Sequence, residues 1–458
     1  MSLFDLSDSR PVHFVGIAGA GMSALAELAA RRGVSVSGCD ANATAAADMA
    51  RLGITVASGH DPAHVDLARA LVVTSAMAQD HPELARARFL GIPVVRRAEA
   101  LAEAVSMGDV IGIAGTHGKT TTTVMTTEAL REAGLAPTGV AGGRVGAWGG
   151  NLSRGDDRVF VVEADEYDRS FLALSPAVAT VTNVEADHLD IYADLADVRD
   201  AFAQFVSRAR TVVLCDDDPG AATLPTANGA EVIRYGVSSA DARLRARDLL
   251  TGGGGSRFMA EFDGESVADV SLRVPGRHNV LNALAALAGG LALGANAERM
   301  ARGLERFTGV ERRFQRIGSQ RGVLVIDDYA HHPTEIRATL AAAREAHPGR
   351  RIIAAFQPHL FSRTRDFASD FGEALSASDL IFLTEIYPAR EQPIPGVTSS
   401  LVENAIHAAG GVLAWRGGRT ELAAALRKAV REDDVVLTMG AGDITQTGPE
   451  LLSLLDTV

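Results

Sequence analysis

Residues 110–123, VIGIAGTHGKTTTT, combine the residue types that bind phosphate. An apolar, β-branched run leads into glycines, Lys119 and four threonines, which predicts a strand, a tight loop and a helix. In such a loop, backbone amides contact phosphate oxygens, the lysine reaches the β- and γ-phosphates, and Thr120 places a hydroxyl on Mg²⁺. The strict spacing GxxxxGK[ST] is not met, because Ile113 occupies the position of the first glycine. The flanking strand and helix still predict a nucleotide-phosphate site, and therefore a protein that uses ATP.

Two further predicted strands end in acidic residues. The strand at 159–162 leads into Glu163-Ala164-Asp165-Glu166, and the strand at 177–182 leads to Asp187 and His188. Carboxylates beside a phosphate loop suit Mg²⁺, which takes few protein ligands and keeps phosphate and water. A lone histidine is more often structural, but the acidic cluster around His188 favours a functional role.

A second glycine-rich turn follows the strand predicted at 12–15. Its glycines, Gly16, Gly19 and Gly21, are spaced GxxGxG, whereas the dinucleotide fingerprint is GxGxxG. Both spacings allow a tight turn and a close approach of the backbone to a diphosphate. Asp40 follows the next predicted strand, where an acidic residue would meet a ribose or a base. The alternative interpretation is a turn that only packs a helix on a sheet.

Other segments indicate further parallel sheet and further binding groups. Asn279 and Asn282 share one face of a predicted helix, and they could present amides to adenine or cap the helix. Near the C-terminus, four predicted strands end in polar, charged or glycine residues, as a second open α/β sheet would. Histidines and arginines after two of these strands favour a carboxylate or phosphate site. These strands span 323–326, 352–356, 380–384 and 435–438.

Composition excludes several function classes. The 458 residues suffice for two to four domains, and 47% apolar with 22% charged residues is typical of a soluble protein. A net charge of −13 argues against a nucleic-acid surface. Cys39 and Cys215 form no metal-spacing or redox motif, which favours a reducing compartment. We see no signal peptide, and the apolar run at 283–297 is too short to span a bilayer, so we expect a cytoplasmic protein.

Five segments taken together resemble the Mur ligase family. They are GTHGKTT at 115–121, EADE at 163–166, DH at 187–188, GRHN at 276–279 and DYAHHP at 328–333. The resemblance runs from about residue 12 to about residue 445. It implies three α/β domains: a Rossmann-like UDP-sugar domain at 1–107, a P-loop ATPase domain at 108–309, and a Rossmann-like amino-acid domain at 310–458.

The resemblance also implies an activity. Within the family, His117, the His331-His332 pair and the run at 357–365 point to the members that join L-alanine to UDP-N-acetylmuramate. The expected reaction is an ATP-dependent ligation at the lactyl carboxylate, through an acyl phosphate, in peptidoglycan precursor synthesis. A ligase that recycles an intact tripeptide, and a non-catalytic UDP-sugar or ATP sensor, are the alternatives. A monomer and a homodimer are both compatible with the sequence.

By the same resemblance, ATP and Mg²⁺ are the cofactors, and residue roles carry over position by position. The catalytic candidates are Lys119, His188 and His332, the two histidines being possible acceptors of the amine proton. Nucleotide contacts are assigned to Gly115, Thr116, His117, Gly118, Lys119, Thr120, Thr121, His278, Asn279, Asn282, Arg313 and Asp328. Metal contacts are assigned to Thr120, Glu163 and His188, and substrate contacts to Gly16, Gly19, Gly21, Asp40, Ser75, His332, His359 and Arg363.

Two positions depart from the family pattern. Many members carry arginine where Leu360 stands, so holding of a carboxylate would rest on Arg363. Many also carry a lysine shortly after the Asp-His pair, whose CO₂ adduct binds magnesium. The corresponding stretch here contains Phe202 and no lysine, so a second magnesium would need another group, for which His188 is the nearest candidate.

Overall fold

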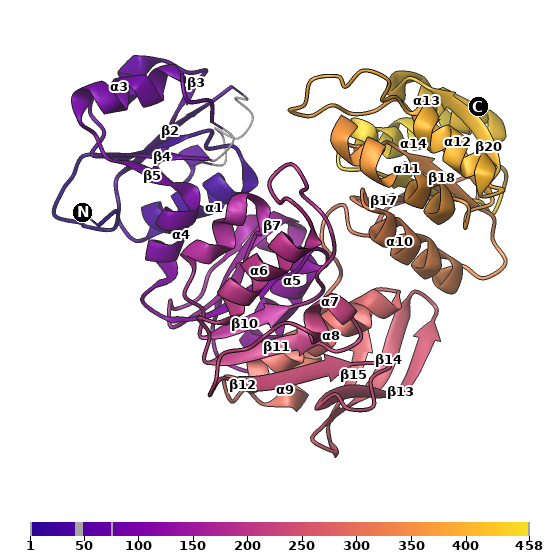
Figure 1. The fold of residues 1–458 in the computed structure, drawn as a ribbon, viewed down its shortest axis with the longest axis horizontal. Coiled ribbons are helices and arrows are strands. Elements are labelled where there is room, and N and C mark those ends of the chain that lie inside the picture. Colours follow the sequence, from indigo (N-terminus) through magenta and orange to yellow (C-terminus); the bar gives the residue numbers. More distant parts are fainter. Residues whose placement is uncertain (1, 42–48, 75–76, 457–458) are drawn as a thin grey trace. The chain divides into compact units, whose positions relative to one another are not determined.

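The computed structural model describes residues 2–41, 49–74 and 77–456, and within them the strands form three sheets. Helices connect most of the successive parallel strands, as Figure 1 shows, and the predicted three-part α/β fold is confirmed. Contacts divide the chain into two compact units. The first unit comprises residues 1–247, 260–269 and 281–304, and the second comprises 248–259, 270–280 and 305–458.

The first sheet has five parallel strands in the order β3-β2-β1-β4-β5. The order reverses between β1 and β4, and ligands bind open α/β sheets at such a switch point. Cys39, Val65, Leu71 and Leu84 are buried together in its core. Its elements are β1 (Val12–Val15), α1 (Ala20–Arg31), β2 (Val36–Asp40), β3 (Thr55–Ser58), η2 (Pro62–Val65), β4 (Ala70–Val73), α3 (Pro82–Leu90), β5 (Val94–Arg96) and α4 (Arg97–Val105).

The second sheet has ten strands in the order β15-β14-β13-β12-β11-β10-β6-β9-β7-β8. The strand that precedes the phosphate loop, β6, pairs in parallel with β9 and β10, so both predicted acidic strand ends flank the loop. Strands of this part are β6 (Asp109–Ala114), β7 (Thr138–Val145), β8 (Gly150–Ser153), β9 (Val159–Glu163), β10 (Val178–Val181), β11 (Thr211–Cys215), β12 (Glu231–Gly236), β13 (Leu244–Gly252), β14 (Gly255–Phe262) and β15 (Glu265–Leu272). The helices are α5 (Lys119–Glu132), η3 (Gly146–Trp148), η4 (Tyr167–Ala173), α6 (Leu195–Val206), α7 (Pro219–Ala222), α8 (Arg277–Leu291) and α9 (Ala297–Arg306).

Helix α5 starts at the phosphate loop and carries six threonines that are almost completely buried. Threonine is a weak helix former, because its branched side chain loses rotamer freedom and its hydroxyl competes for backbone groups. Here the hydroxyls of Thr126 and Thr127 donate to the carbonyls of Thr122 and Thr123, each at 2.7 Å. The helix is therefore stabilised by its burial in the protein, and not by the intrinsic helix propensity of its residues.

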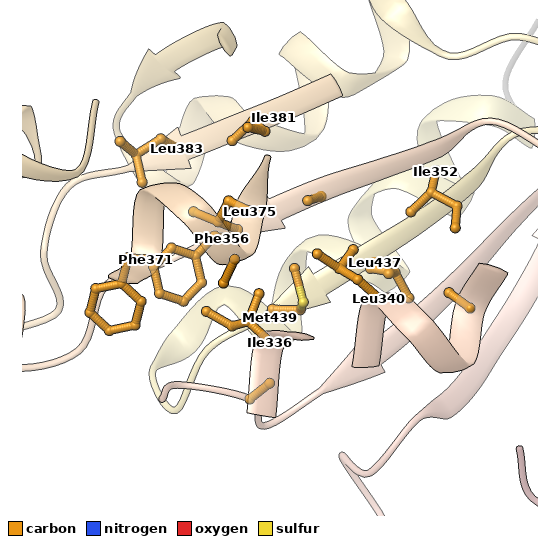
Figure 2. Packing of buried hydrophobic residues seen from close by; sticks show 14 of the residues in the cluster. Ile336, Leu340, Ile352, Phe356, Phe371, Leu375, Ile381, Leu383, Leu437 and Met439 are labelled. Carbon is orange, nitrogen blue, oxygen red and sulfur yellow. The ribbon is translucent and has the colours of Figure 1, made fainter. Parts of the chain in front are cut away.

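The third sheet has six strands in the order β16-β17-β21-β18-β19-β20, parallel except for β16. Alternate residues of its strands enter two separate cores. One core packs against α10, α11 and α12 (Figure 2), and the other packs against α13 and α14. The elements are β16 (Gln315–Gln320), β17 (Val323–Asp328), α10 (Pro333–Ala346), β18 (Ile352–Phe356), α11 (Phe361–Leu375), β19 (Leu380–Thr384), α12 (Ser400–Ala408), β20 (Leu413–Gly417), α13 (Arg419–Ala429), β21 (Val435–Met439), η5 (Asp443–Gln446) and α14 (Thr447–Asp456).

The helices are short. The longest of those described, α8 and α11, have 15 residues each. Over the ranges that the structure describes, no helix combines the length and the apolar character needed to cross a membrane.

Phe202, at the position where many Mur ligases carry lysine, is a core residue on α6. It is fully buried, and its ring lies edge-on to Phe171, with the centroids 5.1 Å apart. We expect Phe202→Ala to lower the free energy of unfolding by about 3–5 kcal/mol, because it leaves a cavity that the core does not refill. Urea denaturation followed by Trp148 fluorescence, in a Trp415→Phe background, measures this change.

Leu195→Ala on the same helix is the matched control, since Leu195 is 42% exposed. Its expected effect is below about 0.5 kcal/mol. Equal losses in the two variants would contradict the assignment of Phe202 to the core.

Candidate active site

The phosphate loop, residues 115–118, joins β6 to α5 through two glycines with positive φ. Gly115 has φ +141°, and a Cβ there would lie 1.9 Å from the hydroxyl oxygen of Thr182. Gly118 has φ +82° and is the N-cap of α5, and a Cβ there would lie 2.7 Å from Asn282 Oδ1. Both positions thus need glycine for conformation and for space. The predicted strand, loop and helix are present.

Residues that follow β10 hold this loop in place. The amide of His117 donates to Asn183 Oδ1 at 2.7 Å, and the Thr182 hydroxyl donates to the His117 carbonyl at 2.6 Å. The hydroxyl of Thr116 accepts from the amide of Glu185 at 2.9 Å. The loop conformation is consequently fixed by the protein itself, which is the preorganisation that phosphate binding uses.

Lys119, the first residue of α5, is charged and nearly buried. Its Nζ donates to the carbonyls of Gly115 and Thr116 at 2.7 and 3.2 Å, and to Glu166 Oε1 at 2.8 Å. Burial alone would lower the pKa of Lys119, but the carboxylates of Glu166, Asp165 and Glu163 more than offset it, so the pKa is raised. The ammonium is therefore kept charged where phosphate would bind.

Glu166 is a site residue that we did not assign from the sequence. Burial raises the pKa of this carboxyl to about 7, although the Lys119 ammonium favours its charged form. Its Oε1 lies 3.7 Å from His188 Nε2, and its backbone carbonyl accepts from the Tyr192 hydroxyl at 2.6 Å. The run EADE predicted a carboxylate at this strand end. Which of its three carboxylates meets Lys119 is decided by the turn into η4, and the sequence spacing does not show it.

Glu163 and Thr120 are brought together at the head of α5. The Thr120 hydroxyl donates to Glu163 Oε1 at 3.0 Å, and the Gly142 amide donates to Glu163 Oε2 at 2.6 Å. Burial raises the pKa of Glu163, with the Gly142 amide opposing that shift. A hydroxyl and a carboxylate beside a phosphate loop are hard oxygen donors of the kind Mg²⁺ takes, so the donor set fits that ion. His188 lies beside Glu166 and Asp187.

The two asparagines of α8 are both buried, and each has a partner within the protein. Asn282 Oδ1 accepts from the Thr122 hydroxyl at 3.1 Å, which ties α8 to α5. Asn279 Nδ2 donates to the carbonyl of Pro275 at 2.7 Å, a local contact at the helix start. Their role toward adenine stays a prediction, as does that of Thr121, which is buried on α5.

The N-terminal glycine turn lies at the switch point of the first sheet. Gly16 has φ +73°, and its amide donates to the Cys39 carbonyl at 2.8 Å. The Ala18 amide donates to Asp40 Oδ2 at 2.9 Å, so this carboxylate holds the turn. Gly19 caps α1, whose N-terminal amides form a natural anion site. Ser75, the other substrate candidate here, lies outside the described residues.

Arg97 is a second residue that we did not assign from the sequence. Its Nη1 lies against the turn, since a Cβ on Gly21 would be only 2.8 Å away. Arg96, Arg97 and Arg169 line a cavity of about 120 Å³ beside η4. The Arg96-Arg97 pair, which follows the apolar residues 92–95, was the available signal. A guanidinium against a glycine turn is suited to a diphosphate.

In the second unit, Asp328 lies at the end of β17. Its carboxylate accepts from the amides of Phe314 and Ala330, each at 2.8 Å. Burial raises the pKa of Asp328 to about 6, and the Arg313 guanidinium opposes that shift. Arg313 also lies 3.3 Å from Glu335. The pKa of the His278 imidazole is lowered to about 4, chiefly by desolvation and secondly by the Arg313 guanidinium.

A group of aromatic and basic side chains follows β17, β18 and β19. The His359 ring lies 5.9 Å from the rings of His331 and Tyr387, and Arg363 Nη1 lies 3.4 Å from His359 Nδ1. His359 and Arg363, both predicted, are therefore together, and His331 and Tyr387 join them without having been assigned. Leu360 has φ +68° and is buried at the start of α11.

His332, predicted to contact substrate and to take part in catalysis, has a structural role at the start of a helix. It is the N-cap of α10, where its Nδ1 accepts from the Thr334 amide at 3.4 Å, and its ring packs edge-on to Phe367. The buried capping position explains its orientation without a substrate. Its predicted catalytic role is not tested by this geometry.

Comparison with known proteins adds to these observations. Three family models match successive parts of the chain: the "Mur ligase family, catalytic domain" model at 11–108, the "Mur ligase middle domain" model at 113–290, and the "Mur ligase, glutamate ligase domain" model at 312–442. Together they include the glycine turn, the phosphate loop with both acidic strand ends, and the cluster around His359.

Similar proteins cover nearly the whole chain. The UDP-N-acetylmuramate–L-alanine ligase of Renibacterium salmoninarum is 44% identical over 99% of this chain and 97% of its own. That of Streptomyces avermitilis is 46% identical over 97% of each chain. The crystal structure of the UDP-N-acetylmuramate–alanine ligase of Thermotoga maritima matches with a TM-score of 0.81 at 30% identity, covering 97% of this chain and 98% of that one.

A murein peptide ligase from Psychrobacter arcticus shares the fold, with a TM-score of 0.70 at 24% identity over 98% of this chain and 99% of that one. The matched models, the relatives and the phosphate-loop geometry lead to one assignment. The chain belongs to the Mur ligase family.

Proposed function

We propose that this protein is an ATP-dependent ligase that joins L-alanine to the lactyl carboxylate of UDP-N-acetylmuramate, in peptidoglycan precursor synthesis. The observation that carries the proposal is the buried Lys119 ammonium at the head of α5, with Glu166 and the pair of Thr120 and Glu163 around it. The identity of 44–46% to curated L-alanine ligases over nearly the whole chain supports the choice of substrates. The reaction belongs in the cytoplasm, and both a monomer and a homodimer are compatible with it.

The proposed reaction has two steps. In the first, a carboxylate oxygen of the sugar nucleotide attacks the γ-phosphorus of ATP, an O–P bond forms, and ADP leaves. In the second, the amine of alanine attacks the acyl carbon, phosphate leaves, and the amine proton passes to a base. Lys119 would exchange Glu166 for phosphate oxygens and stabilise the charge that develops on the transferred group.

Mg²⁺ is the cation that this site would hold, with Thr120 and Glu163 as its protein ligands. Bound there, it would neutralise charge on the β- and γ-phosphates. Both groups are oxygen donors, and the Thr120 hydroxyl lies 3.0 Å from Glu163 Oε1. His188 is proposed as a further contact, because it approaches Glu166 next to the same cluster.

Two alternatives predict different substrates. A tripeptide-recycling ligase would prefer a peptide to alanine, and the 44–46% identity to curated L-alanine ligases over nearly the whole chain favours alanine. A non-catalytic sensor would not need the buried ammonium and its carboxylates.

For the remaining substrate contacts, we propose the N-terminal glycine turn with Arg97 for the diphosphate, and His359 with Arg363 for a carboxylate.

Phosphate release is expected only when ATP, UDP-N-acetylmuramate and L-alanine are all present. The physical reason is that the acyl phosphate forms from the sugar nucleotide and is consumed by the amine. A coupled phosphate assay with each component omitted in turn measures this dependence. Equal ATP turnover without either substrate would indicate a simple NTPase, and a clear preference for the tripeptide would indicate the recycling enzyme.

Lys119→Ala should lower kcat by on the order of 10³ or more, because it removes a charge that stabilises the transferred phosphoryl group. Binding of UDP-N-acetylmuramate, measured by calorimetry, should change little, since the glycine turn lies on another sheet. Lys428→Ala is the control: Lys428 is the chain's only other lysine and is exposed. Loss of sugar-nucleotide binding in the Lys119 variant would show that the two sites are not separable.

Activity is expected to be insensitive to removal of bicarbonate, because Phe202 cannot form a carbamate, Lys119 is paired with Glu166, and Lys428 is exposed on α13. His188→Ala should raise the Mg²⁺ concentration for half-maximal activity by roughly tenfold or more. The exposed His407 provides the control variant, His407→Ala. Bicarbonate-dependent rescue would reveal a carbamate, and an unchanged Mg²⁺ titration would remove His188 from the metal site.

A further inference from the structure

A second group of potential metal ligands lies in the first sheet. His13 on β1, Cys39 on β2, His64 in η2 and Glu83 in the first turn of α3 each offer one ligand atom, and these four atoms lie within 4.8 Å of one another. We propose that this group, called here the His-Cys-Glu cluster, binds one zinc ion.

The donor types and the spacing both suit zinc. Structural zinc sites are tetrahedral and take thiolate, imidazole and carboxylate, with neighbouring ligand atoms about 3.3–3.8 Å apart at normal bond lengths. In the cluster, Cys39 Sγ lies 3.1 Å from both carboxylate oxygens of Glu83, and His64 Nδ1 lies 2.8 Å from Glu83 Oε1. Shifts of about 1 Å or less would bring all four atoms onto one ion.

His13 provides an independent indication. The side chain is 2% exposed, and its Nδ1 lies 2.9 Å from the Ser37 hydroxyl. Its Nε2 is buried and has no hydrogen-bond partner. A histidine held by a hydroxyl at one nitrogen, with the other nitrogen buried and unpaired, has the arrangement of a metal ligand with its outer-shell support.

The charges of the His-Cys-Glu cluster also favour a bound cation. Glu83 is fully buried, and among the described residues its partners are the thiol of Cys39, the imidazoles of His60 and His64, and the Asp61 amide. No lysine or arginine among the described residues pairs with the Glu83 carboxylate. A thiolate and a carboxylate with two neutral imidazoles would balance the charge of Zn²⁺, with the thiol proton released on binding.

A competing set of His60, His81 and Glu83 shares the carboxylate. It offers three ligand atoms, none of them sulfur, and His60 is exposed. The four-donor set with the thiolate is the better match to a closed zinc site. The two sets make different predictions for single variants.

The test uses the tag-free full-length protein, stripped with a chelator and titrated with Co²⁺ and then Zn²⁺ in excess Mg²⁺. One ion per chain is expected by elemental analysis, with a thiolate-to-cobalt charge-transfer band that Zn²⁺ abolishes. Cys39→Ser and His13→Asn should remove the band, whereas Cys215→Ser, which changes the other buried cysteine, should keep it. Zn²⁺ should also raise the Tm of the wild type and not that of Cys39→Ser.

His64→Asn changes a ligand that is partly exposed, and it keeps the test decisive if a core variant fails to fold. It should bind Co²⁺ at least tenfold more weakly. The proposal is overturned if the wild type binds no stoichiometric ion, if the band persists in Cys39→Ser, or if binding is lost in His81→Asn but kept in His13→Asn.

Discussion

The nearly buried, charged Lys119 ammonium is the group around which the polar contacts of the central part of the molecule are arranged. An unpaired buried charge costs several kcal/mol, so a lysine at this position needs acceptors around it. The loop supplies two carbonyls, and the residues after β9 supply Glu166. Three carboxylates, Glu163, Asp165 and Glu166, then act on one ammonium. The pKa of Glu166 is raised chiefly by burial, and the neighbouring Asp165 carboxylate adds to that shift. The site is built to receive additional positive charge together with phosphate.

Much of the fold could be predicted because apolar, β-branched segments end at glycines or acids throughout the chain. These signals locate β1, β6, β9, β10 and the strands of the third sheet. The order of strands could not be obtained in this way, because it depends on which elements pack together and not on local preference. The two cores of the third sheet show this, since strands that read as uniformly apolar divide their side chains between two layers of helices.

The candidate site was predictable where contacts are local along the chain. Lys119 and Thr120 follow from the loop motif, and Glu163 from its strand end. Glu166 was missed because a turn decides which carboxylate meets Lys119. Arg97 was missed because the packing of α4 against the N-terminal glycine turn, and not any local motif, brings its guanidinium to that turn. The His-Cys-Glu cluster illustrates the limit: its members are spread over seventy residues, so no spacing rule finds them, and the sequence suggested that Cys39 had no metal motif.

The threonines of α5 have a consequence for what holds the phosphate loop in place. Isolated helices need favourable residues and length, and a run of β-branched residues gives α5 little stability by itself. It can form stably only once the sheet around β6 is present to bury it. The phosphate loop, which ends at the first residue of α5, therefore depends on the intact sheet, and loss of strand pairing around β6 would remove the nucleotide site together with the helix.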